Sequence, residues 1–336
     1  MPAKNATLGG TVIELVEPLR FEAARRPVPT PWPGEVVIEM RALGMCGTDL
    51  HMFGGRGGVY PHVVGHDGAA VVHAVGAGVD EGLLGQRVTI DPLTRCGECA
   101  ACVSGEYQLC STGGYLGMLG PGLLGQYVAL DAAQVIPLPD EVTDAAATAL
   151  EPVTVALHTL EKISAIVTEP RPTAVIGGGP LGILLAQVLG HEGFACTVFE
   201  PEPSRRELGS RLGVTMVPAE PTDLPDGPRL IVETSAAAAG VELADALATP
   251  GSVVAMVGRA PHSIAPGSVL LKELTLIGVR GGPRQYSRAV EYVAEGIIDT
   301  EAVITHRWDW SEAQEAFRTN LEQPGTVTRA LLSGTW

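Results

Sequence analysis

Five of the six cysteines of this 336-residue chain stand in two groups whose spacing suits metal chemistry. The larger group is separated by two, two and seven residues and consists of Cys96, Cys99, Cys102 and Cys110. Zinc is tetrahedral and favours thiolate and imidazole ligands, and a structural zinc site fills all four positions with protein groups. We therefore expect the segment 96–110 to be a lobe that holds a structural zinc ion.

Four nearby thiols are also compatible with chemistry that does not involve zinc. A disulfide-stapled loop and a redox Cys-x-x-Cys are two such possibilities, although a reducing compartment favours metal over disulfides. An iron–sulfur cluster is a third, but the spacing does not match the bacterial ferredoxin run. The sixth cysteine, Cys196, lies in an apolar run and is expected to be buried in the core.

The second group contains the fifth cysteine, Cys46. This cysteine lies within the sequence Gly-Met-Cys-Gly-Thr-Asp-Leu-His of residues 44–51. His66 and Asp67 follow shortly after it. A catalytic zinc site uses three protein ligands and leaves the fourth position open to water or substrate. This smaller set of residues is typical of such an open site.

A dinucleotide fingerprint follows in the second half of the chain. Its pattern G-x-G-x-x-G is weak alone, but here it follows an apolar strand, opens a helix, and precedes the acidic residue Glu200 by about 20 residues. Glycine lets the backbone approach a pyrophosphate, and a helix N-terminus offers unpaired N–H groups. We expect the cofactor to be bound by Gly177, Gly179, Pro180, Leu181 and Gly182.

Glu200 is placed to accept hydrogen bonds from the adenosine ribose hydroxyls. A carboxylate there repels a 2′-phosphate, so NAD is favoured over NADP as cofactor. Arg205, which we include among the cofactor-binding candidates, and Arg206 complicate this choice. They could cover the adenine or could lie on a solvated helix face.

Several classes of function are disfavoured by composition. The chain is 46% hydrophobic and 18% charged, with a net charge of −16, so we expect a globular protein that binds neither nucleic acid nor an anionic membrane. Residues 1–7 contain no apolar signal core, which predicts a cytoplasmic location. The uncharged run 173–190 is interrupted by glycines and proline, so it is interpreted as strand, turn and buried helix.

The elements that position these residues change in character along the chain. The first half predicts strands at 36–40, 69–72, 87–90 and 126–130, with both parts of the smaller metal group in loops between them. Thr143 is an acceptable N-cap for a helix over 144–162. Strands then alternate with helices, which predicts βαβ units and a doubly wound parallel sheet. The expected strands are 173–176, 196–200, 230–233, 252–257 and 274–279, and the expected helices are 181–191, 204–212, 241–248 and 285–295.

With these motifs in this order, the chain resembles the zinc-dependent medium-chain dehydrogenase/reductase superfamily over nearly its whole length. The likeness is strongest to the polyol, threonine and cyclitol dehydrogenase branch. It implies an α/β protein with a GroES-like β-rich catalytic domain over 1–155 plus 305–336, including the zinc lobe 96–110. It also implies a Rossmann domain, with a doubly wound parallel sheet, over 156–304. A helix at 311–318 and a strand at 326–332 are expected to return to the first domain.

The resemblance also implies roles for the smaller metal group. Cys46, His66 and Glu151 are the implied ligands of a catalytic zinc, since Glu151-Pro152 occupies the place of the family's third ligand in the polyol branch. The family usually has glutamate after the ligand histidine, whereas this chain has the shorter Asp67, which is an alternative ligand. Asp49 is expected to fix the tautomer of His66.

A proton relay is implied as well, from Thr48 through a ribose hydroxyl of the cofactor to His51 and then to solvent. Each of these residues could also have a simpler role. Thr48 could cap a helix, His51 could be a surface histidine, and Glu151 could be an ordinary helix-face carboxylate. His158 shares the helix face of Glu151 and is the other histidine to check.

We therefore expect two zinc ions per chain and NAD-linked oxidation of a secondary alcohol to a ketone. The substrate is expected to be small, polar and hydroxylated: a polyol, a cyclitol or aminocyclitol, a sugar or an amino alcohol. The apolar stretches 268–271 and 274–277 suggest a homodimer or homotetramer. The competing hypotheses are a zinc-free NADPH-dependent reductase of the same fold and a zinc-ribbon interaction protein without catalysis.

Overall fold

The computed structural model describes residues 6–220 and 228–336, and contacts divide this chain into two compact units. Unit 1 comprises residues 1–151 and 286–336, and unit 2 comprises residues 152–285. The return to unit 1 thus begins before residue 305, the boundary expected from the sequence. The reason is α9 (Tyr286–Ala294), whose buried Tyr286 hydroxyl donates to the carbonyl oxygen of Ile90 at 2.9 Å.

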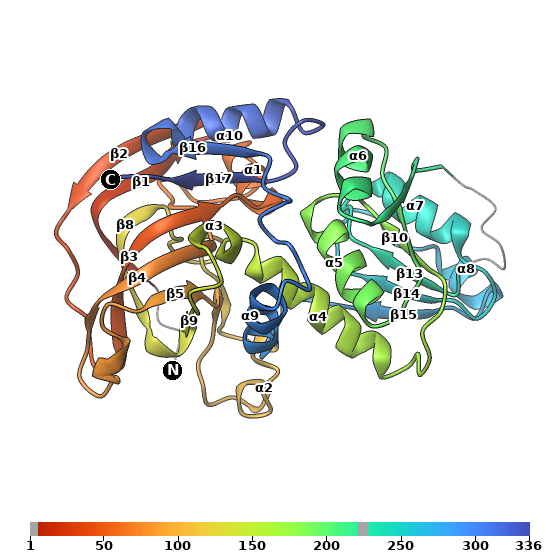
Figure 1. The fold of residues 1–336 in the computed structure, drawn as a ribbon, viewed down its shortest axis with the longest axis horizontal. Coiled ribbons are helices and arrows are strands. Elements are labelled where there is room, and N and C mark those ends of the chain that lie inside the picture. Colours follow the sequence, from red (N-terminus) through yellow and green to blue (C-terminus); the bar gives the residue numbers. More distant parts are fainter. Residues whose placement is uncertain (1–5, 221–227) are drawn as a thin grey trace. The chain divides into compact units, whose positions relative to one another are not determined.

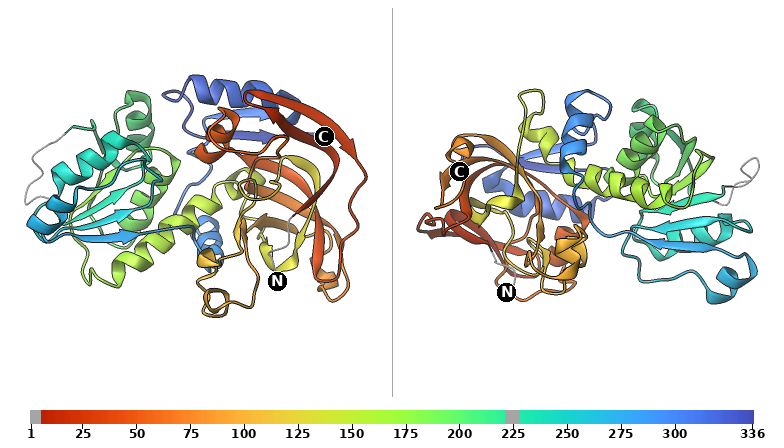
Figure 2. Two further views of the ribbon diagram at one scale, coloured as in Figure 1. Left: turned by 180° about the vertical axis from the view of Figure 1, so that it is seen from behind. Right: turned by 90° about the horizontal axis from the view of Figure 1, so that it is seen from below.

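Unit 1 is built on one large, curved and mainly antiparallel sheet (Figures 1 and 2). Its strands are β1 (Thr7–Glu17), β2 (Arg20–Arg26), β3 (Glu35–Gly44), β4 (Asp67–Val75), β5 (Arg87–Ile90), β8 (Gly125–Asp131), β9 (Val135–Pro137), β16 (His306–Asp309) and β17 (Ala330–Ser333). The path runs β2-β1-β8-β3-β4-β5-β9, and β17 joins it by pairing antiparallel with β3. The buried core of this unit includes Leu15, Ile38, Phe53 and Phe317.

Short elements complete unit 1. They are α1 (Gly47–Phe53), η1 (Glu81–Leu83), β6 (Leu93–Thr94), α2 (Ala100–Val103), η2 (Tyr107–Leu109), β7 (Gly114–Tyr115), η3 (Ala132–Gln134), α3 (Asp144–Ala147), η4 (Trp310–Glu312) and α10 (Ala313–Glu322). The prediction that residues 46–51 lie in a loop is wrong, because residues 47–53 form α1. Likewise, Asp67 is not a loop residue but the first residue of β4.

The four strands expected in the first half all occur, but β1 and β2 were missed. β2 alternates poorly, since its sequence Arg-Phe-Glu-Ala-Ala-Arg-Arg carries four charges and is largely exposed. Its pairing with β1 along a long hairpin, rather than an apolar face, makes it a strand. β16 was missed for the same reason: only its parallel pairing with β17 defines it.

Unit 2 is a parallel sheet in the order β12-β11-β10-β13-β14-β15 (Figure 1). Its strands are β10 (Thr173–Ile176), β11 (Cys196–Phe199), β12 (Thr215–Val217), β13 (Leu230–Glu233), β14 (Val253–Met256) and β15 (Thr275–Gly278). Its helices are α4 (Leu150–Ser164), α5 (Pro180–His191), α6 (Pro203–Arg211), α7 (Ala238–Leu247) and α8 (Pro266–Leu271). The strand order extends from β10 in one direction and from β13 in the other, so the right-handed crossovers usual for parallel strands put α5 and α6 on one face and α7 on the other (Figure 1). The Rossmann-type topology is therefore confirmed.

The helix expected over 144–162 is broken into α3 and α4. Thr143 does cap α3, since its hydroxyl accepts the N–H of Ala146 at 2.9 Å. A helix running through Pro152 would need an N–H that proline lacks, and the ring would clash with the carbonyl of Thr148. In the structure, that carbonyl accepts a hydrogen bond from Arg329. The break places Glu151 in the first turn of α4.

Candidate active site

Within the described residues, side chains of the metal-ligating types converge in two places. One group is Cys96, Cys99, Cys102 and Cys110, and the other is Cys46, His66 and Asp67. Within each group, one ligand atom per residue lies within 4.8 Å of all the others. Both groups lie in unit 1.

The four-cysteine group fits a tetrahedral zinc ion. The Sγ of Cys96 lies 3.8 Å from that of Cys102 and 3.6 Å from that of Cys110. Zn–S bonds of about 2.3 Å would separate tetrahedral thiolates by about 3.8 Å, whereas a disulfide needs about 2.05 Å. All six cysteines, each in the described part of the chain, are free. Burial raises the pKa of Cys110, but N–H groups of Cys96 and Thr112 outweigh it and lower that pKa to about 6.

The lobe around these thiols is fastened to the end of β5. Asp91 Oδ2 accepts hydrogen bonds from Arg95 Nη1 at 3.0 Å and from the Tyr107 hydroxyl at 2.9 Å. The Arg95 guanidinium also lies over the Tyr107 ring, 4.2 Å from its centroid. This arrangement connects both ends of the cysteine segment to the sheet.

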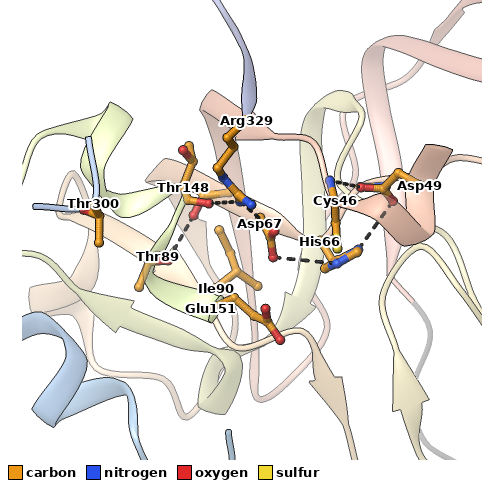
Figure 3. Close-up of polar contacts among 12 residues, drawn as sticks. Cys46, Asp49, His66, Asp67, Thr89, Ile90, Thr148, Glu151, Thr300 and Arg329 are labelled. Atoms are coloured by element: carbon orange, nitrogen blue, oxygen red, sulfur yellow. Dashed lines mark hydrogen bonds and ion pairs between the residues drawn. The ribbon is translucent and has the colours of Figure 1, made fainter. Parts of the chain in front are cut away.

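Asp49 organises the second group (Figure 3). Its Oδ2 accepts the N–H of Cys46 at 3.0 Å, and its Oδ1 accepts the N–H of Gly65 at 3.0 Å. The same Oδ1 lies 3.4 Å from Nδ1 of His66. The first turn of α1, with Cys46 as its N-cap, thereby holds the segment that carries His66.

The two carboxylate oxygens of Asp67 differ: one faces the metal-ligating group, and the other is bonded to Arg329. Its Oδ2 accepts a hydrogen bond from Arg329 Nη2 at 2.7 Å, and both side chains are buried. Its Oδ1 lies 3.7 Å from Nε2 of His66 and has no hydrogen-bond partner in the described part of the chain. An unpartnered buried oxygen beside a thiol and an imidazole fits a metal ligand. Sequence reasoning missed Arg329, which no local pattern connects to a residue 262 positions away.

The electrostatics of this group favour positive charge. Burial lowers the pKa of His66, but Asp49 and Asp67 outweigh burial and raise that pKa well above its usual value. Burial raises the pKa of Asp49, whereas His66 and the N–H groups of Cys46 and Gly65 lower it further, so the net shift is downward. The field that stabilises a proton on His66 would equally stabilise a divalent cation.

Glu151 lies outside the 4.8 Å grouping of Cys46, His66 and Asp67. Its Oε1 accepts a hydrogen bond of 3.4 Å from the hydroxyl of Tyr115, a residue that sequence reasoning did not single out. The Tyr115 ring meets the His66 ring edge-on, with centroids 6.0 Å apart. Burial and the charge of Asp67 raise the pKa of Glu151 to about 8, against opposing effects of His66 and Arg329.

The two residues of the expected relay lie on α1. Thr48 does not cap this helix, because Cys46 does. The Thr48 hydroxyl is buried and has no hydrogen-bond partner in the described residues, whereas His51, three residues on, is exposed. His158 is not part of this group: it is buried in unit 2, with its Nδ1 3.0 Å from Glu161.

The dinucleotide turn of unit 2 requires glycine at two positions. Gly177 has a φ of +101°, and an added Cβ would lie 2.9 Å from the backbone of Ser235. A Cβ on Gly182 would lie 1.8 Å from the carbonyl oxygen of Gly177. Pro180 opens α5. A tight turn followed by a helix N-terminus is the geometry that accommodates a pyrophosphate.

Glu200 follows β11 directly and is buried beside this turn. Its Oε2 accepts the N–H of Gly178 at 2.6 Å. The guanidinium of Arg205 lies 4.0 Å from the same oxygen. Arg206 instead donates to the carbonyl oxygens of Glu200 and Pro201 at 2.8 and 2.6 Å, so its guanidinium is occupied by the protein itself.

A GroES-like β domain combined with a parallel sheet carrying a dinucleotide turn defines the medium-chain alcohol dehydrogenase class. Residues 32–140 match the family model of the alcohol dehydrogenase GroES-like domain. The chain is 32% identical to 2-dehydro-3-deoxy-L-galactonate 5-dehydrogenase from Pseudoalteromonas atlantica, over 82% of this chain and 84% of that protein. It is 29% identical to sorbitol dehydrogenase from Bacillus subtilis, over 88% and 89%.

A solved structure agrees over both units. Alcohol dehydrogenase RspB from Escherichia coli CFT073, crystallised with NADH, superposes with a TM-score of 0.86 at 26% identity, covering 96% of this chain and 99% of that one. The chain belongs to the zinc-type medium-chain alcohol dehydrogenase superfamily, in its sorbitol, threonine and galactonate dehydrogenase-like branch. It is an NAD(P)-dependent dehydrogenase that acts on CH–OH groups. Among the described residues, no helix is both long and apolar enough to span a bilayer.

Proposed function

We propose that the chain is a zinc-dependent, NAD-linked dehydrogenase that oxidises a secondary alcohol of a small polar substrate to the ketone. The observation that carries the proposal is the convergence of Cys46, His66 and Asp67, with Asp67 Oδ1 buried and lacking a hydrogen bond in the described chain. The dinucleotide turn in the same chain supplies the site for a hydride acceptor.

The residues that would hold the catalytic zinc are Cys46, His66 and Asp67, and the lobe cysteines would hold the structural one. A zinc ion held there would supply Lewis-acid chemistry at the substrate hydroxyl, and a bound nicotinamide would supply the hydride acceptor. Arg329 orients Asp67, and Asp49 orients His66. Glu151, bonded to Tyr115, is the second carboxylate of the site rather than its third resting ligand.

Thr48 is the first acceptor of the substrate proton in this proposal. Its buried hydroxyl lacks a hydrogen-bond partner in the described chain, and a hydroxyl can accept and donate at once. His51 lies one helical turn further along α1 and is exposed. It can therefore release the proton to solvent near neutral pH.

NAD is proposed as the cofactor in preference to NADP. Glu200 lies buried beside the turn, 2.6 Å from the N–H of Gly178. A fixed carboxylate at that place repels a 2′-phosphate. Arg205 is close enough to Glu200 to be paired with it, which reduces its capacity to attract that phosphate.

The substrate class is proposed from the polarity of the site and from the relatives. Glu151, Asp67 and the Tyr115 hydroxyl make the surroundings of the metal group polar. The named activities of the relatives, sorbitol and 2-dehydro-3-deoxy-L-galactonate dehydrogenases, concern multiply hydroxylated compounds. A polyol, sugar, sugar acid, cyclitol or amino alcohol is therefore favoured over an apolar alcohol.

We also propose that the active form is a homodimer or homotetramer. β15 pairs only with β14 among the described strands, so its other edge is open. Beside it, Leu270 and Leu271 of α8 are 76% and 84% exposed. An open edge strand beside exposed leucines is suited to pairing with a second copy of the chain.

The proposal is tested by metal analysis combined with a substrate screen. We expect about two zinc ions per chain, in accordance with two tetrahedral sites. We also expect reduction of NAD, faster than of NADP, with at least one polyol, sugar acid, cyclitol or amino alcohol. One zinc per chain without turnover would instead support a zinc-ribbon interaction protein, and a zinc-free protein that prefers NADPH would support the reductase.

A further inference from the structure

Glu233 is a fully buried carboxylate that the proposed chemistry does not use. It ends β13 and has no exposed surface. Its Oε1 accepts the backbone N–H of Ser235 at 2.7 Å and also the Ser235 hydroxyl. Its Oε2 has no hydrogen bond of ordinary geometry in the described residues. Burial raises the pKa of Glu233, and the N–H groups of Ser235 and Ala236 only partly offset that effect. A group that is so costly to bury points to a role beyond packing.

What Glu233 holds is the loop 234–236. Ser235 connects Glu233 to α7, since its hydroxyl also accepts the N–H of Ala237, the N-cap of that helix, at 3.2 Å. Ala236 has a φ of +55°, in the left-handed region that a residue with a Cβ seldom adopts. Such strain persists only where neighbouring contacts enforce it. The bonds to Glu233 are those contacts.

Glycines around the loop leave room for this arrangement. A Cβ on Gly240 would lie 2.0 Å from the Ser235 hydroxyl oxygen. A Cβ on Gly258 would lie 2.5 Å from the backbone nitrogen of Ala236 and 2.6 Å from Glu233 Oε2. The loop and its carboxylate are therefore closely surrounded by backbone, and the loop has little space in which to shift.

The same loop lies against the dinucleotide turn. Thr234 donates from its hydroxyl to the carbonyl oxygens of Ile176 and Gly177, at 2.8 and 3.1 Å. Ser235 is the residue that forbids a side chain at Gly177. β13 and β10 are neighbouring parallel strands. Successive strands are added to the sheet on one side from β10 to β12 and on the other side from β13 to β15, so the topological switch point lies between β10 and β13. Ligands of doubly wound sheets bind at the carboxyl ends of the strands at this switch point.

We infer that Glu233 is a positioning residue for the dinucleotide, fixing the loop 234–236 as a second wall of the site opposite the Gly177–Gly182 turn. The inference rests on the proposed nucleotide site. The hydroxyls of Thr234 and Ser235 are used within the protein, so the loop presents backbone groups to the pyrophosphate and its adjoining ribose. A rigid backbone wall raises affinity because it is ordered before the ligand arrives.

The first test is Glu233→Gln in the full, zinc-loaded chain, with Glu242→Gln on the exposed face of α7 as the control. NADH fluorescence titration gives the Kd, and steady-state kinetics give KM for NAD and kcat. We expect Kd and KM to rise about tenfold with kcat within about twofold, since ground-state cofactor binding is what is lost. An unchanged Kd and KM in a folded variant would overturn the inference.

Ala236→Gly separates positioning from folding if the first variant folds poorly. Glycine adopts a φ of +55° without strain, so the melting temperature should stay the same or rise. The loop 234–236 becomes less ordered in the protein without bound cofactor, so the Kd for NADH should rise about threefold. Unchanged affinity contradicts the inference. If the wild-type chain binds neither NADH nor NADPH, the proposed function itself fails, whereas wild-type binding that both variants retain removes only the role of Glu233.

Discussion

At the scale of single residues, the site depends on how Asp67 is held. The sequence pattern identified Cys46, His66 and both carboxylates but ranked Glu151 above Asp67 as the metal ligand. In the structure, Arg329 donates a hydrogen bond to Asp67, and the Tyr115 hydroxyl donates one to Glu151. Neither partner is adjacent in sequence to the carboxylate that it contacts, so only the fold shows which oxygen stays available.

Removal of Arg329 should destabilise the protein strongly. In Arg329→Met, Asp67 would remain buried without its cation, which costs about 3–5 kcal/mol in comparable buried pairs. Arg318→Met is the matched control, since its 3.8 Å pair with Glu315 is exposed and should contribute less than about 1 kcal/mol. Urea unfolding of the metal-free proteins measures both. Equal losses in the two variants would show that the Asp67 pair has no special weight.

The raised pKa of Glu151 predicts a pH dependence of metal-free stability. Its folded pKa of about 8 exceeds the ordinary value of 4.5, so the protonated form stabilises the fold. This contribution is complete below about pH 4.5 and is lost as pH rises through 8. Glu151→Gln should therefore lose less stability than wild type between pH 5.5 and 8.5 in chelator, whereas exposed Glu207→Gln should match wild type. Parallel stability curves for all three proteins would contradict the shift.

At the scale of elements, the sequence predicts strands and helices with a clear apolar pattern, but it does not predict strands that only their pairing with another strand defines. The strands 173–176 and 230–233 occur with the bounds that the sequence predicts, because parallel strands buried on both faces are apolar throughout. β2 and β16 escaped detection because pairing with distant strands defines them. The break between α3 and α4 was not predicted, although Pro152 disfavours a continuous helix there. The carbonyl oxygen of Thr148, which the break leaves without a helical partner, accepts a hydrogen bond from Arg329, far along the chain.

In the proposed function, the cysteine lobe is the element that should depend most on metal. Its helix α2 spans only four residues and buries none of them, so packing contributes little to its order. Cys99→Ser should lower the zinc content by one per chain and make residues 96–110 sensitive to protease, with NADH binding intact. Cys196→Ser is the control, because that thiol lies on β11 of unit 2 and belongs to neither cluster. Mass spectrometry locates the cleavage, and resistance equal to that of wild type would contradict the proposed role.

Cys196 itself is half-buried rather than fully buried, a difference from the sequence expectation. Burial still raises its pKa to about 12. A thiol of that pKa is almost entirely protonated at pH 8, so it should react slowly with iodoacetamide. Labelling of the zinc-loaded chain followed by peptide mapping tests this, and rapid modification of Cys196 in the folded protein would refute it.

At the scale of the whole molecule, the order of motifs identified the family, whereas the proposed assembly would depend on an exposed surface of unit 2. The sequence marked two apolar stretches, 268–271 and 274–277, and in the structure the first lies in α8 and the second largely in the edge strand β15. Leu276→Lys on β15 should convert an oligomer into monomers at micromolar concentration, because it places a charge on the open edge. Leu84→Lys, on another exposed leucine, should leave the assembly intact. Sedimentation velocity distinguishes the two, and an unchanged oligomer in Leu276→Lys would exclude this edge.

A divalent ion held by Cys46, His66 and Asp67 is, in the proposed function, required for turnover. The most direct measurement combines zinc content, NADH affinity and turnover in Cys46→Ser, using the best substrate of the screen. We predict one zinc per chain instead of two, an unchanged Kd for NADH, and turnover reduced at least about a hundredfold. Two zinc ions per chain with wild-type turnover would contradict the proposed role of the metal.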